Sequence, residues 1–575
     1  MANKRIDNIF MRYKKMQQNK ASLKSLYTLI SEYVYNRKYA TEASVPNSGI
    51  FADEDIYDNT AQRANGIMAN VMVNNIWPNG PRTFSLNHTW DTDDNKGVKD
   101  YFSYVNQRMY AVMDNTKAGL QTALDEYMLD QGSFATSGIY VKEKEDDDTI
   151  PVRYEAWGIN GRYIDEGPDG NIDTIFSEIK MSVRNAVKVY GYDNLSKTVR
   201  DLYDKGELEN KVAFLHVIEP RIDRDRSKKG AKDMPIASIH LEKATRKIVK
   251  ESGLEEMPVF MGRFSKVPGE IYGRSPAMVA MADILEINAV REAISIATEK
   301  LLDPPIGVYD DGALGAGSID TSAGAINVFS VTGRLNAGKP IEPLYTVGEL
   351  NSSYTYLDTL KEDINNHFYL DRLLDFNNET RMTLGEAQLR NALRGQSLGA
   401  FYARQENEVI TPMIERTFNI LLKRGHLGVI RGSKLEQQQI ARGISPVYIP
   451  DEIVNRITRG DDIYEINYLS PAKRTMQSEE LRGIMETANF AVQVAPIKPE
   501  ILDDIDFDKL IERIAVLSGA PKELLQDSKT VKAIRDARAQ QQEDAAKIEQ
   551  ARQQSEIGRN VAQMNAMQPK EALVG

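Results

Sequence analysis

The chain carries the sequence Gly-Glu-Ile-Tyr-Gly-Arg-Ser-Pro at residues 269–276, between an apolar run and a long segment of helical pattern. The run before it includes Val259–Met261, whose composition is typical of a strand. Ser275 is a favoured helix N-cap, and Pro276 suits the first helical turn. Apolar residues then recur at roughly helical spacing as far as Asp-Pro-Pro at 303–305, where proline ends the helix because it lacks an N–H group. The stretch therefore predicts a strand, a turn and one long helix.

Composition limits the kinds of protein this chain can be. Its 575 residues are too many for one core, and 72 basic against 83 acidic residues give a net charge of −11. A protein that grips DNA over its whole surface would be basic instead. Cysteine is absent, which excludes disulfides, thiolate metal sites and cysteine nucleophiles. No apolar run reaches the roughly 18–20 residues of a membrane span, and the first residues do not resemble a signal peptide, so we expect a soluble intracellular product without a membrane partner.

The first half of the chain reads as helices followed by strands. We expect helices over about 8–38, 54–76 and 98–131, with Gly132 as the C-cap of the third. Strand-like patterns follow over about 138–180, with a hairpin turn at 168–171, and over about 211–264, interrupted by a charged loop at 221–233.

The second half is mainly helical. A glycine-rich segment contains one strand at 325–331, a helix is expected over about 347–370, and the polar residues 371–382 interrupt the pattern. A capping-box signature at Thr383 opens a very long helix, to about 423, which Pro412 should kink. From Gln540 the tail is rich in Gln, Ala and Glu, and it is either disordered or one strand of an intersubunit helical barrel. The fold class is α+β and predominantly helical.

Motifs that suggest chemistry are incomplete. Residues 333–339 match the spacing of a phosphate-binding loop, but Pro340 stands where the magnesium-binding hydroxyl belongs. The aspartates near 503–508 lack the glycine and distal glutamate of a calcium loop, and N-capping carboxylates explain them better. The five histidines are scattered with no pair at ligand spacing. The basic loop at 221–233 either meets phosphate or is a solvated hairpin tip, and the second reading is favoured because acidic residues interrupt it. We therefore expect no enzyme, no cofactor and no metal.

Several short sequence segments, in a specific order, resemble the portal (head-to-tail connector) proteins of short-tailed, podovirus-type double-stranded DNA bacteriophages. They fall at intervals between about residues 50 and 540, and none is a catalytic signature. The turn near 77–82 departs from the aromatic-rich version usual in that family. The resembling phrases are 269–276 with the following helix, Leu129–Gly132 with Gly138–Val141, Tyr163–Asn171, Glu408–Leu422, Tyr468–Arg474 and Pro499–Asp506.

The resemblance implies the portal fold of wing, stem, clip and crown, assembling into a closed ring, usually a dodecamer. The elements it implies are a wing at 1–275, a stem helix at 276–302, a clip at 303–346, a second stem helix at 347–370, a tunnel loop at 371–382, a long wing helix and return at 383–472, and a crown with a helical or disordered tail at 473–575.

Specific residues follow from that assignment. Polar residues of the tunnel loop would contact the DNA backbone without reading its sequence, and we expect them to be Arg372, Asn377, Asn378 and Arg381. The apolar stripes of the stem helices would meet neighbouring subunits through Met281, Ile284, Leu285, Ile294, Tyr354, Leu357 and Ile364. The clip would include Asp303, Pro304, Pro305, Ile326 and Val328.

The function implied by the resemblance is a ring at one capsid vertex through which double-stranded DNA is packaged and ejected. An acidic wall would repel phosphate and let the polymer slide. Implied partners are further copies of the chain, double-stranded DNA, the terminase large subunit, head-tail adaptor or tail proteins, and the major capsid and scaffolding proteins. The implied location is the portal vertex of the virion, after assembly in the host cytoplasm. The alternative is another head-tail adaptor or scaffold component without a DNA channel.

Overall fold

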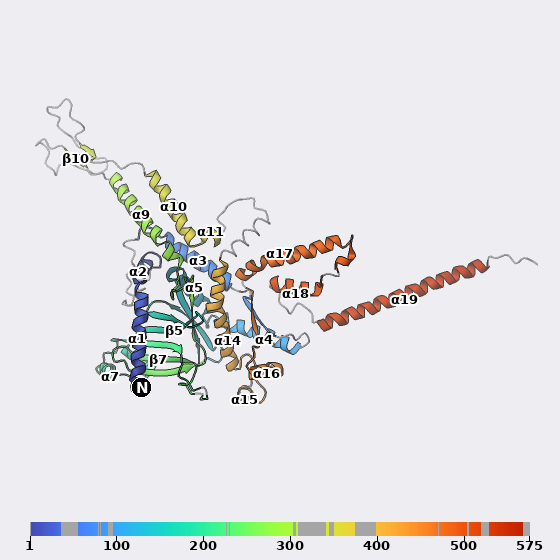
Figure 1. Ribbon diagram of the computed structural model, residues 1–575, viewed down its shortest axis with the longest axis horizontal. Helices are drawn as coiled ribbons and strands as arrows, with labels where there is room; N and C mark the ends of the chain where they lie inside the picture. Colours follow the sequence, from blue (N-terminus) through green and yellow to red (C-terminus); the bar gives the residue numbers. More distant parts are fainter. Residues whose placement is uncertain are drawn as a thin grey trace, which may run out of the picture. The chain divides into compact units, whose positions relative to one another are not determined.

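The computed structural model describes most of the chain (Figure 1). The described residues are 2–35, 56–78, 80, 82–89, 96–145, 147–225, 227–228, 230–302, 306–308, 341–343, 350–373, 398–469, 471–502, 505–518 and 528–566. The predicted strand at 325–331 and the capping box at Thr383 lie outside them. Helix accounts for 56% of the structure, so the predominantly helical α+β prediction is confirmed. Among the described residues, no helix combines the length and apolarity needed to cross a membrane.

The chain divides into two units. The first comprises Met1–Pro81 and Ala111–Leu421, and the second comprises Arg82–Tyr110 and Leu422–Gly575. Each unit is therefore assembled from segments that are far apart in the sequence.

A five-stranded antiparallel sheet forms one part of the first unit. Its strand order is β4-β5-β6-β7-β8, and the tight connection between β4 and β5 passes Gly170, whose φ of +75° suits glycine. This confirms the predicted hairpin turn and the predicted β region, since the charged loop separates β6 from β7. The strands are β4 (Arg162–Glu166), β5 (Ile172–Ser182), β6 (Lys211–Pro220), β7 (Ile236–Glu242) and β8 (Ile248–Leu254).

Helices build a separate core on each face of that sheet. Helix α1 (Ala2–Ala21) packs Ile9, Phe10 and Tyr13 against one core, to which β6 contributes Leu215. The preceding residue in β6, Phe214, belongs to the other core with α6 (Val183–Tyr190) and α7 (Lys197–Asp204). Successive strand residues point to opposite faces, so one strand serves both cores.

A three-stranded sheet of order β3-β2-β9 lies in the same unit. Its strands are β2 (Thr136–Glu143), β3 (Val152–Gly158) and β9 (Val259–Arg263), and helix α5 (Leu120–Phe134) contacts β2 and β3. The predicted C-cap at Gly132 is wrong, because α5 continues to Phe134 and is capped by Ala135, with φ 63°. Gly132 is glycine for a packing reason: a Cβ there would collide with the side chains of Asn65 and Met68.

Two of the predicted long helices are each divided in two. The first predicted helix is α1 followed by α2 (Lys24–Tyr33), and a turn separates them at residues 22–23. The third is α4 (Lys96–Met113) followed by α5, with Gly119 at φ 74° in the connection. The second is α3 (Thr60–Ile76), which begins later than predicted.

The remaining elements of the first unit follow β9. They are α8 (Pro276–Val279), α9 (Met281–Leu302), the antiparallel pair β10 (Ile306–Val308) and β11 (Ile341–Pro343), α10 (Asn351–His367), α11 (Leu370–Leu373), α13 (Gly399–Gln405), the π-helical turn η1 (Glu406–Ile410) and α14 (Thr411–Lys423). Ser275 caps α8 by accepting from the Met278 N–H, with Pro276 in the first turn, which confirms the start predicted from sequence.

The second unit contains one strand pair and several helices. Strand β1 (Phe84–Asn87) pairs antiparallel with β12 (Glu465–Tyr468). Two helices precede β12 in the later segment of this unit, α15 (Lys434–Ala441) and α16 (Asp451–Arg459). The helices that follow β12 are α17 (Pro471–Val494), η2 (Pro499–Leu502), α18 (Phe507–Ser518) and α19 (Ser528–Ala566).

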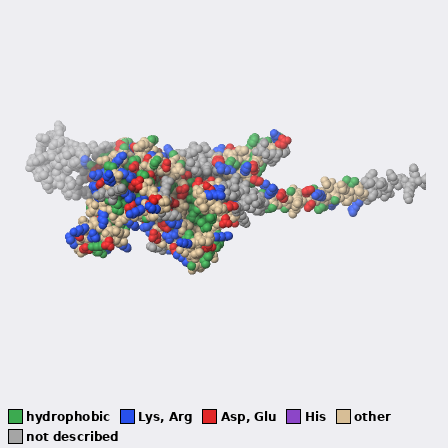
Figure 2. All heavy atoms as spheres, turned by 60° about the horizontal axis from the view of Figure 1, so that its bottom comes forward, with side chains coloured by type: hydrophobic (Ala, Val, Ile, Leu, Met, Phe, Trp, Pro, Cys, Tyr) green, Lys and Arg blue, Asp and Glu red, His purple; other side chains and the backbone are tan. Residues whose placement is uncertain are grey.

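Helix α19 makes up the described part of the glutamine-rich tail, and its place in an intersubunit helical barrel stays a prediction. It is helical rather than disordered over 39 residues, and its side chains from Lys532 to Asn560 are exposed. Figure 2 shows charged, apolar and other side chains mixed along this helix.

Candidate functional site

Helices α9 and α10 run side by side in the first unit, as Figure 1 shows. Two polar contacts join them: His367 Nε2 lies 3.1 Å from Asp283 Oδ2, and the Tyr356 hydroxyl donates to Glu286 Oε1 at 2.5 Å. Buried apolar side chains occur on both helices, and they are Met281, Ile284, Ile287 and Ile294 on α9 with Leu357, Leu360 and Ile364 on α10. The pair is therefore held together within one chain.

Most of the residues expected at the intersubunit face of these helices are buried within the single chain. Met281, Ile284, Ile294, Leu357 and Ile364 are at most 8% exposed, whereas Leu285 is 36% and Tyr354 47% exposed. Further large apolar side chains are exposed on α8 and α9, namely Val279, Ile296, Leu301 and Leu302. The intersubunit role of the seven residues stays a prediction, and only Leu285 and Tyr354 are exposed on the single chain.

The helix pair is acidic. Helices α8 to α10 carry seven carboxylates, at Asp283, Glu286, Glu292, Glu299, Asp358, Glu362 and Asp363, against three basic side chains, at Arg291, Lys300 and Lys361. The surplus of negative charge repels the phosphate backbone of a nucleic acid rather than binding it.

The start of α8 is joined to α5 and β2 by hydrogen bonds. The Ser275 hydroxyl donates to the Ser133 carbonyl at 2.6 Å while it accepts from the Met278 N–H at 3.1 Å. Two residues earlier, the Gly273 N–H donates to Thr136 Oγ1 at 3.0 Å. The loop at 269–276 thus has fixed partners in the protein interior on both sides of Arg274.

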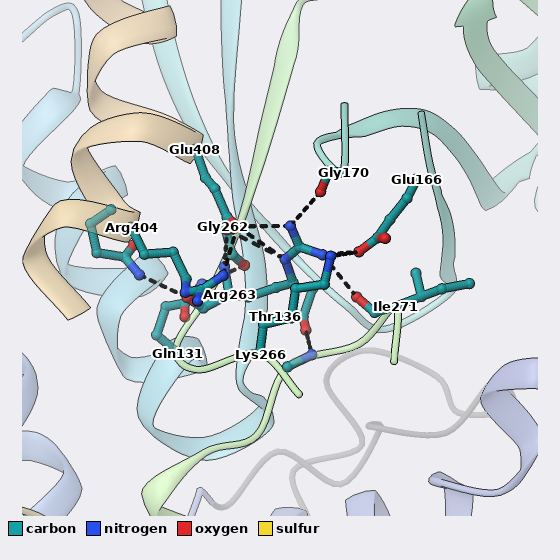
Figure 3. Close-up of polar contacts among 12 residues, drawn as sticks. Gln131, Thr136, Glu166, Gly170, Gly262, Arg263, Lys266, Ile271, Arg404 and Glu408 are labelled. Carbon is teal, nitrogen blue, oxygen red and sulfur yellow. Dashed lines mark hydrogen bonds and ion pairs between the residues drawn. The ribbon is translucent and has the colours of Figure 1, made fainter. Parts of the chain in front are cut away.

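An ion cluster around one buried arginine lies beside that loop (Figure 3). We call it the Arg263 junction, and it consists of Arg263, Glu166, Lys266, Arg404 and Glu408. The Arg263 side chain, 2% exposed, donates to Glu408 Oε1 at 2.7 Å and to the Gly170 carbonyl at 2.9 Å, and it also pairs with Glu166. Glu408 further accepts from the Arg263 backbone N–H at 2.8 Å. A buried charge is tolerated only when it is paired and hydrogen-bonded, and both conditions hold here.

Neutral amides extend the junction into the helices around it. Gln405 Nε2 donates to the Arg263 carbonyl at 3.0 Å, and its amide oxygen accepts from the Tyr127 hydroxyl. Gln131 Nε2 donates to the Gly262 carbonyl at 2.7 Å. A Cβ on Gly262 would collide with the Tyr127 hydroxyl and the Val409 side chain, so the strand approaches the helices this closely only because residue 262 is glycine.

The π turn η1 brings Glu408 to the junction. Pro412 has no N–H to donate to the Glu408 carbonyl, and its ring would clash with that carbonyl in a regular α-helix. The structure has a π turn at Glu406–Ile410, directly before α14, and the kink expected at Pro412 stays a prediction. Single π turns frequently occur at functional positions of helices.

A second buried cluster lies in the five-stranded sheet. The rings of His216 and His240, paired across β6 and β7, stack with centroids 3.9 Å apart and planes 9° apart. His216 Nε2 lies 2.9 Å from Ser238 Oγ, and His240 Nδ1 lies 3.2 Å from the Tyr190 hydroxyl. Burial holds the pKa of His216 well below its usual value and, with Lys250 nearby, lowers the pKa of His240 to about 4. We call this pair the histidine stack, and the sequence spacing of the two residues did not reveal it.

The other predicted site residues are described only in part. Arg372 lies in α11, half-exposed, with its guanidinium 5.6 Å from the centroid of the Tyr369 ring. Asn377, Asn378 and Arg381 of the expected tunnel loop lie outside the described residues, as do the expected clip residues Asp303, Pro304, Pro305, Ile326 and Val328. The structure therefore does not test whether these residues come together.

The aspartates near residue 506 behave as helix-start residues where the structure describes them. Asp506 Oδ1 accepts from the N–H groups of Asp508 and Lys509, each at 3.2 Å, at the beginning of α18. No cluster of three or more His, Asp or Glu side chains suited to a metal ion occurs within the described part of the chain.

Comparison with known proteins assigns the family. Residues 7–525 match the family described as bacteriophage head to tail connecting protein. The chain belongs to this family. The connector is similar to a protein of Bordetella phage BPP-1 named "Probable portal protein", with 27% identity over 93% of this chain and 92% of the relative. It is also similar to the "Portal protein" of Salmonella phage epsilon15, with 24% identity over 95% of this chain and 93% of the relative.

One solved structure with a match to the connector is titled "Virion of native gene transfer agent (GTA) particle". The similarity covers 69% of this chain and 93% of that chain at 9% identity, with a TM-score of 0.29. A score this low carries no argument about the fold.

Proposed function

We propose that the connector is one subunit of the portal ring through which double-stranded DNA enters the capsid during packaging and leaves it during ejection. One observation carries the proposal: two proteins named as portal proteins align with more than nine-tenths of this chain, and the chain covers more than nine-tenths of each of them. A match of that extent relates the whole subunit to them rather than one shared domain.

The helix pair α9 and α10 supports a stem that lines a DNA channel. In this assignment the two helices are the stem helices at 276–302 and 347–370, and their acidic side chains keep phosphate from pairing with the wall. The ring itself, usually a dodecamer in such proteins, requires a head-to-tail interface that closes on itself.

The remaining regions take roles around this stem. The two sheets with α1, α3 and α5 would form the wing, residues 303–346 the clip, residues 371–382 the tunnel loop, and residues 473–575 the crown and its tail. The clip would meet the terminase large subunit during packaging and the head-tail adaptor or tail proteins afterwards. The wing would meet the major capsid and scaffolding proteins at one vertex of the virion, after assembly in the host cytoplasm.

The proposed mechanism involves no bond chemistry in this chain. A separate ATPase moves the DNA, and the connector supplies a passage whose wall repels the polymer. Within this scheme, Arg372, Asn377, Asn378 and Arg381 would form a ring of donors that touches the DNA backbone without reading its sequence.

Electron microscopy of the purified protein, together with the mass of the intact assembly, tests the proposal. We expect closed rings with a central hole wide enough for duplex DNA. A stable monomer under every condition, including co-expression with scaffolding protein, would favour a head-tail adaptor without a channel. For the tunnel loop, replacing all four donors by alanine should leave rings intact and let packaged DNA leak, and normal retention of DNA would contradict the assignment.

A further inference from the structure

Helices α17 and α18 form a two-helix hairpin in the second unit (Figure 1). Arg513 in the middle of α18 pairs with Glu480 in α17 at 2.5 Å, across the hairpin. Among the described side chains of α17, only Ala491 is buried, with 2% exposed. Leu481, Ile484 and Ala488 of α17 are half-buried, so the described side chains of this helix form only a thin core.

Large apolar side chains on α17 are exposed instead. Phe490 is 63% exposed, Val492 58% and Met485 45%. Isolated exposed apolar residues are ordinary, but three on one helix, with a single fully buried residue among its described side chains, indicate that another surface covers them.

These side chains lie on two different flanks of α17. A helix turns about 100° per residue, so Phe490 lies about 100° to one side of the buried Ala491 and Val492 lies about 100° to the other. Met485 shares the flank of Val492, seven residues before it and about two turns away. The strip that faces away from Ala491 is polar and contains Arg482, Asn489 and Gln493.

We infer that this hairpin packs between two neighbouring copies of itself, with Phe490 of one subunit against Met485 and Val492 of the next. A helix with apolar residues on one face and on both flanks of that face is normally covered on all three. In a two-fold dimer the same flank of both copies meets, so the other flank stays exposed. In a head-to-tail contact one flank of each copy meets the opposite flank of the next copy, so both flanks are covered. The inference rests on the proposed function, because it places these contacts in the portal ring.

The absence of cysteine from the chain allows a direct test by cross-linking. The variant with Met485→Cys and Phe490→Cys carries one thiol on each flank. The two positions are separated by about 7.5 Å along the helix and point to different sides, beyond the reach of a disulfide within one chain. Mild oxidation should therefore join successive subunits and give a ladder of covalent multimers on a denaturing gel without reductant.

The matched control carries Arg482→Cys and Asn489→Cys, seven residues apart on the polar strip of the same helix. Oxidation of this variant should give no ladder. A ladder from the flank variant alone supports the inference. Rings seen by electron microscopy in the flank variant, with no ladder after oxidation, would overturn it while leaving the proposed function intact.

A charge variant covers the case in which the cysteine variant fails to assemble. Phe490→Asp should abolish rings at a protein concentration at which the wild type and Asn489→Asp both assemble. Normal assembly of Phe490→Asp would overturn the inference. If the wild type itself forms no rings under any condition, the proposed function fails first and this inference fails with it.

Discussion

The Arg263 junction and the histidine stack both lie in the first unit, but the first is built from ion pairs around a buried arginine and the second from two stacked rings with hydroxyl partners. In the junction, Arg263 has two carboxylate partners and a carbonyl acceptor. In the stack, each imidazole has one polar partner and faces another imidazole, and burial lowers the pKa of both rings. Burial disfavours the charged form of the two imidazoles, whereas each carboxylate beside Arg263 lies against its guanidinium, so the two sites compensate for burial in different ways.

The largest expected effect comes from removing one charge of the junction without changing its shape. Glu408→Gln leaves the buried Arg263 guanidinium with Glu166 as its one carboxylate partner, and breaking a buried ion pair in this way costs about 3–5 kcal/mol. The urea midpoint of the purified protein measures the loss. A loss below about 1 kcal/mol would mean that the junction behaves like a surface ion pair.

The histidine stack should make stability depend on pH. Both histidines have a lower pKa in the folded chain than the usual 6.5, so the unfolded chain binds more protons between these values. Stability is therefore fully present above about pH 6.5 and is lost as the pH falls towards about 4, by on the order of 2–3 kcal/mol for His240 alone.

Urea midpoints measured between pH 4 and 8 test this dependence. His240→Gln keeps a polar partner for Tyr190 but does not titrate, so it should flatten the pH profile. An unchanged profile in His240→Gln would show that other groups set the pH dependence.

A smaller effect is expected from the close packing beside the junction. Gly262→Ala places a methyl group against Tyr127 and Val409, and such overpacking costs about 1–3 kcal/mol. Gly66→Ala is the control, because a Cβ there meets nothing within 4 Å in helix α3 and should stabilise by about 0.5–1 kcal/mol. Equal midpoints for the two variants would contradict the packing argument.

The smallest effect should come from an ion pair outside the interior. Glu270 and Arg274 pair at 2.5 Å on the exposed side of the loop at 269–276. Glu270→Gln should change stability by less than about 1 kcal/mol, because water and salt screen exposed charges. If this variant lost as much as Glu408→Gln, burial would not be what distinguishes the two pairs.

Helix starts and tight turns were predictable from sequence, because residues adjacent in the chain determine them. Ser275 and Pro276 identified the start of the helix because capping depends on adjacent residues. The hairpin turn near Gly170 was predicted for the same reason. The family was also recognisable, because phrases along the chain resemble it in order.

Long-range packing was not predictable in the same way. Gly132 was interpreted as a cap, but its role depends on Asn65 and Met68, which lie more than sixty residues away in the sequence. Arg263 and Glu408 are separated by 145 residues, and no local pattern pairs them. The histidine stack depends on the register of β6 and β7, which places His216 opposite His240. The pair could have been found by aligning β6 and β7 outwards from the loop that joins them, because that register places His216 opposite His240.

The Ser275 hydroxyl has a consequence for how force travels through the subunit. The same oxygen caps the first turn leading into α9 and donates to the Ser133 carbonyl in α5. Together with the hydrogen bond from the Gly273 N–H to Thr136, this contact ties the loop before α9 to both α5 and β2. A shift of α9 along its axis must therefore either break these hydrogen bonds or carry α5 and β2 with it.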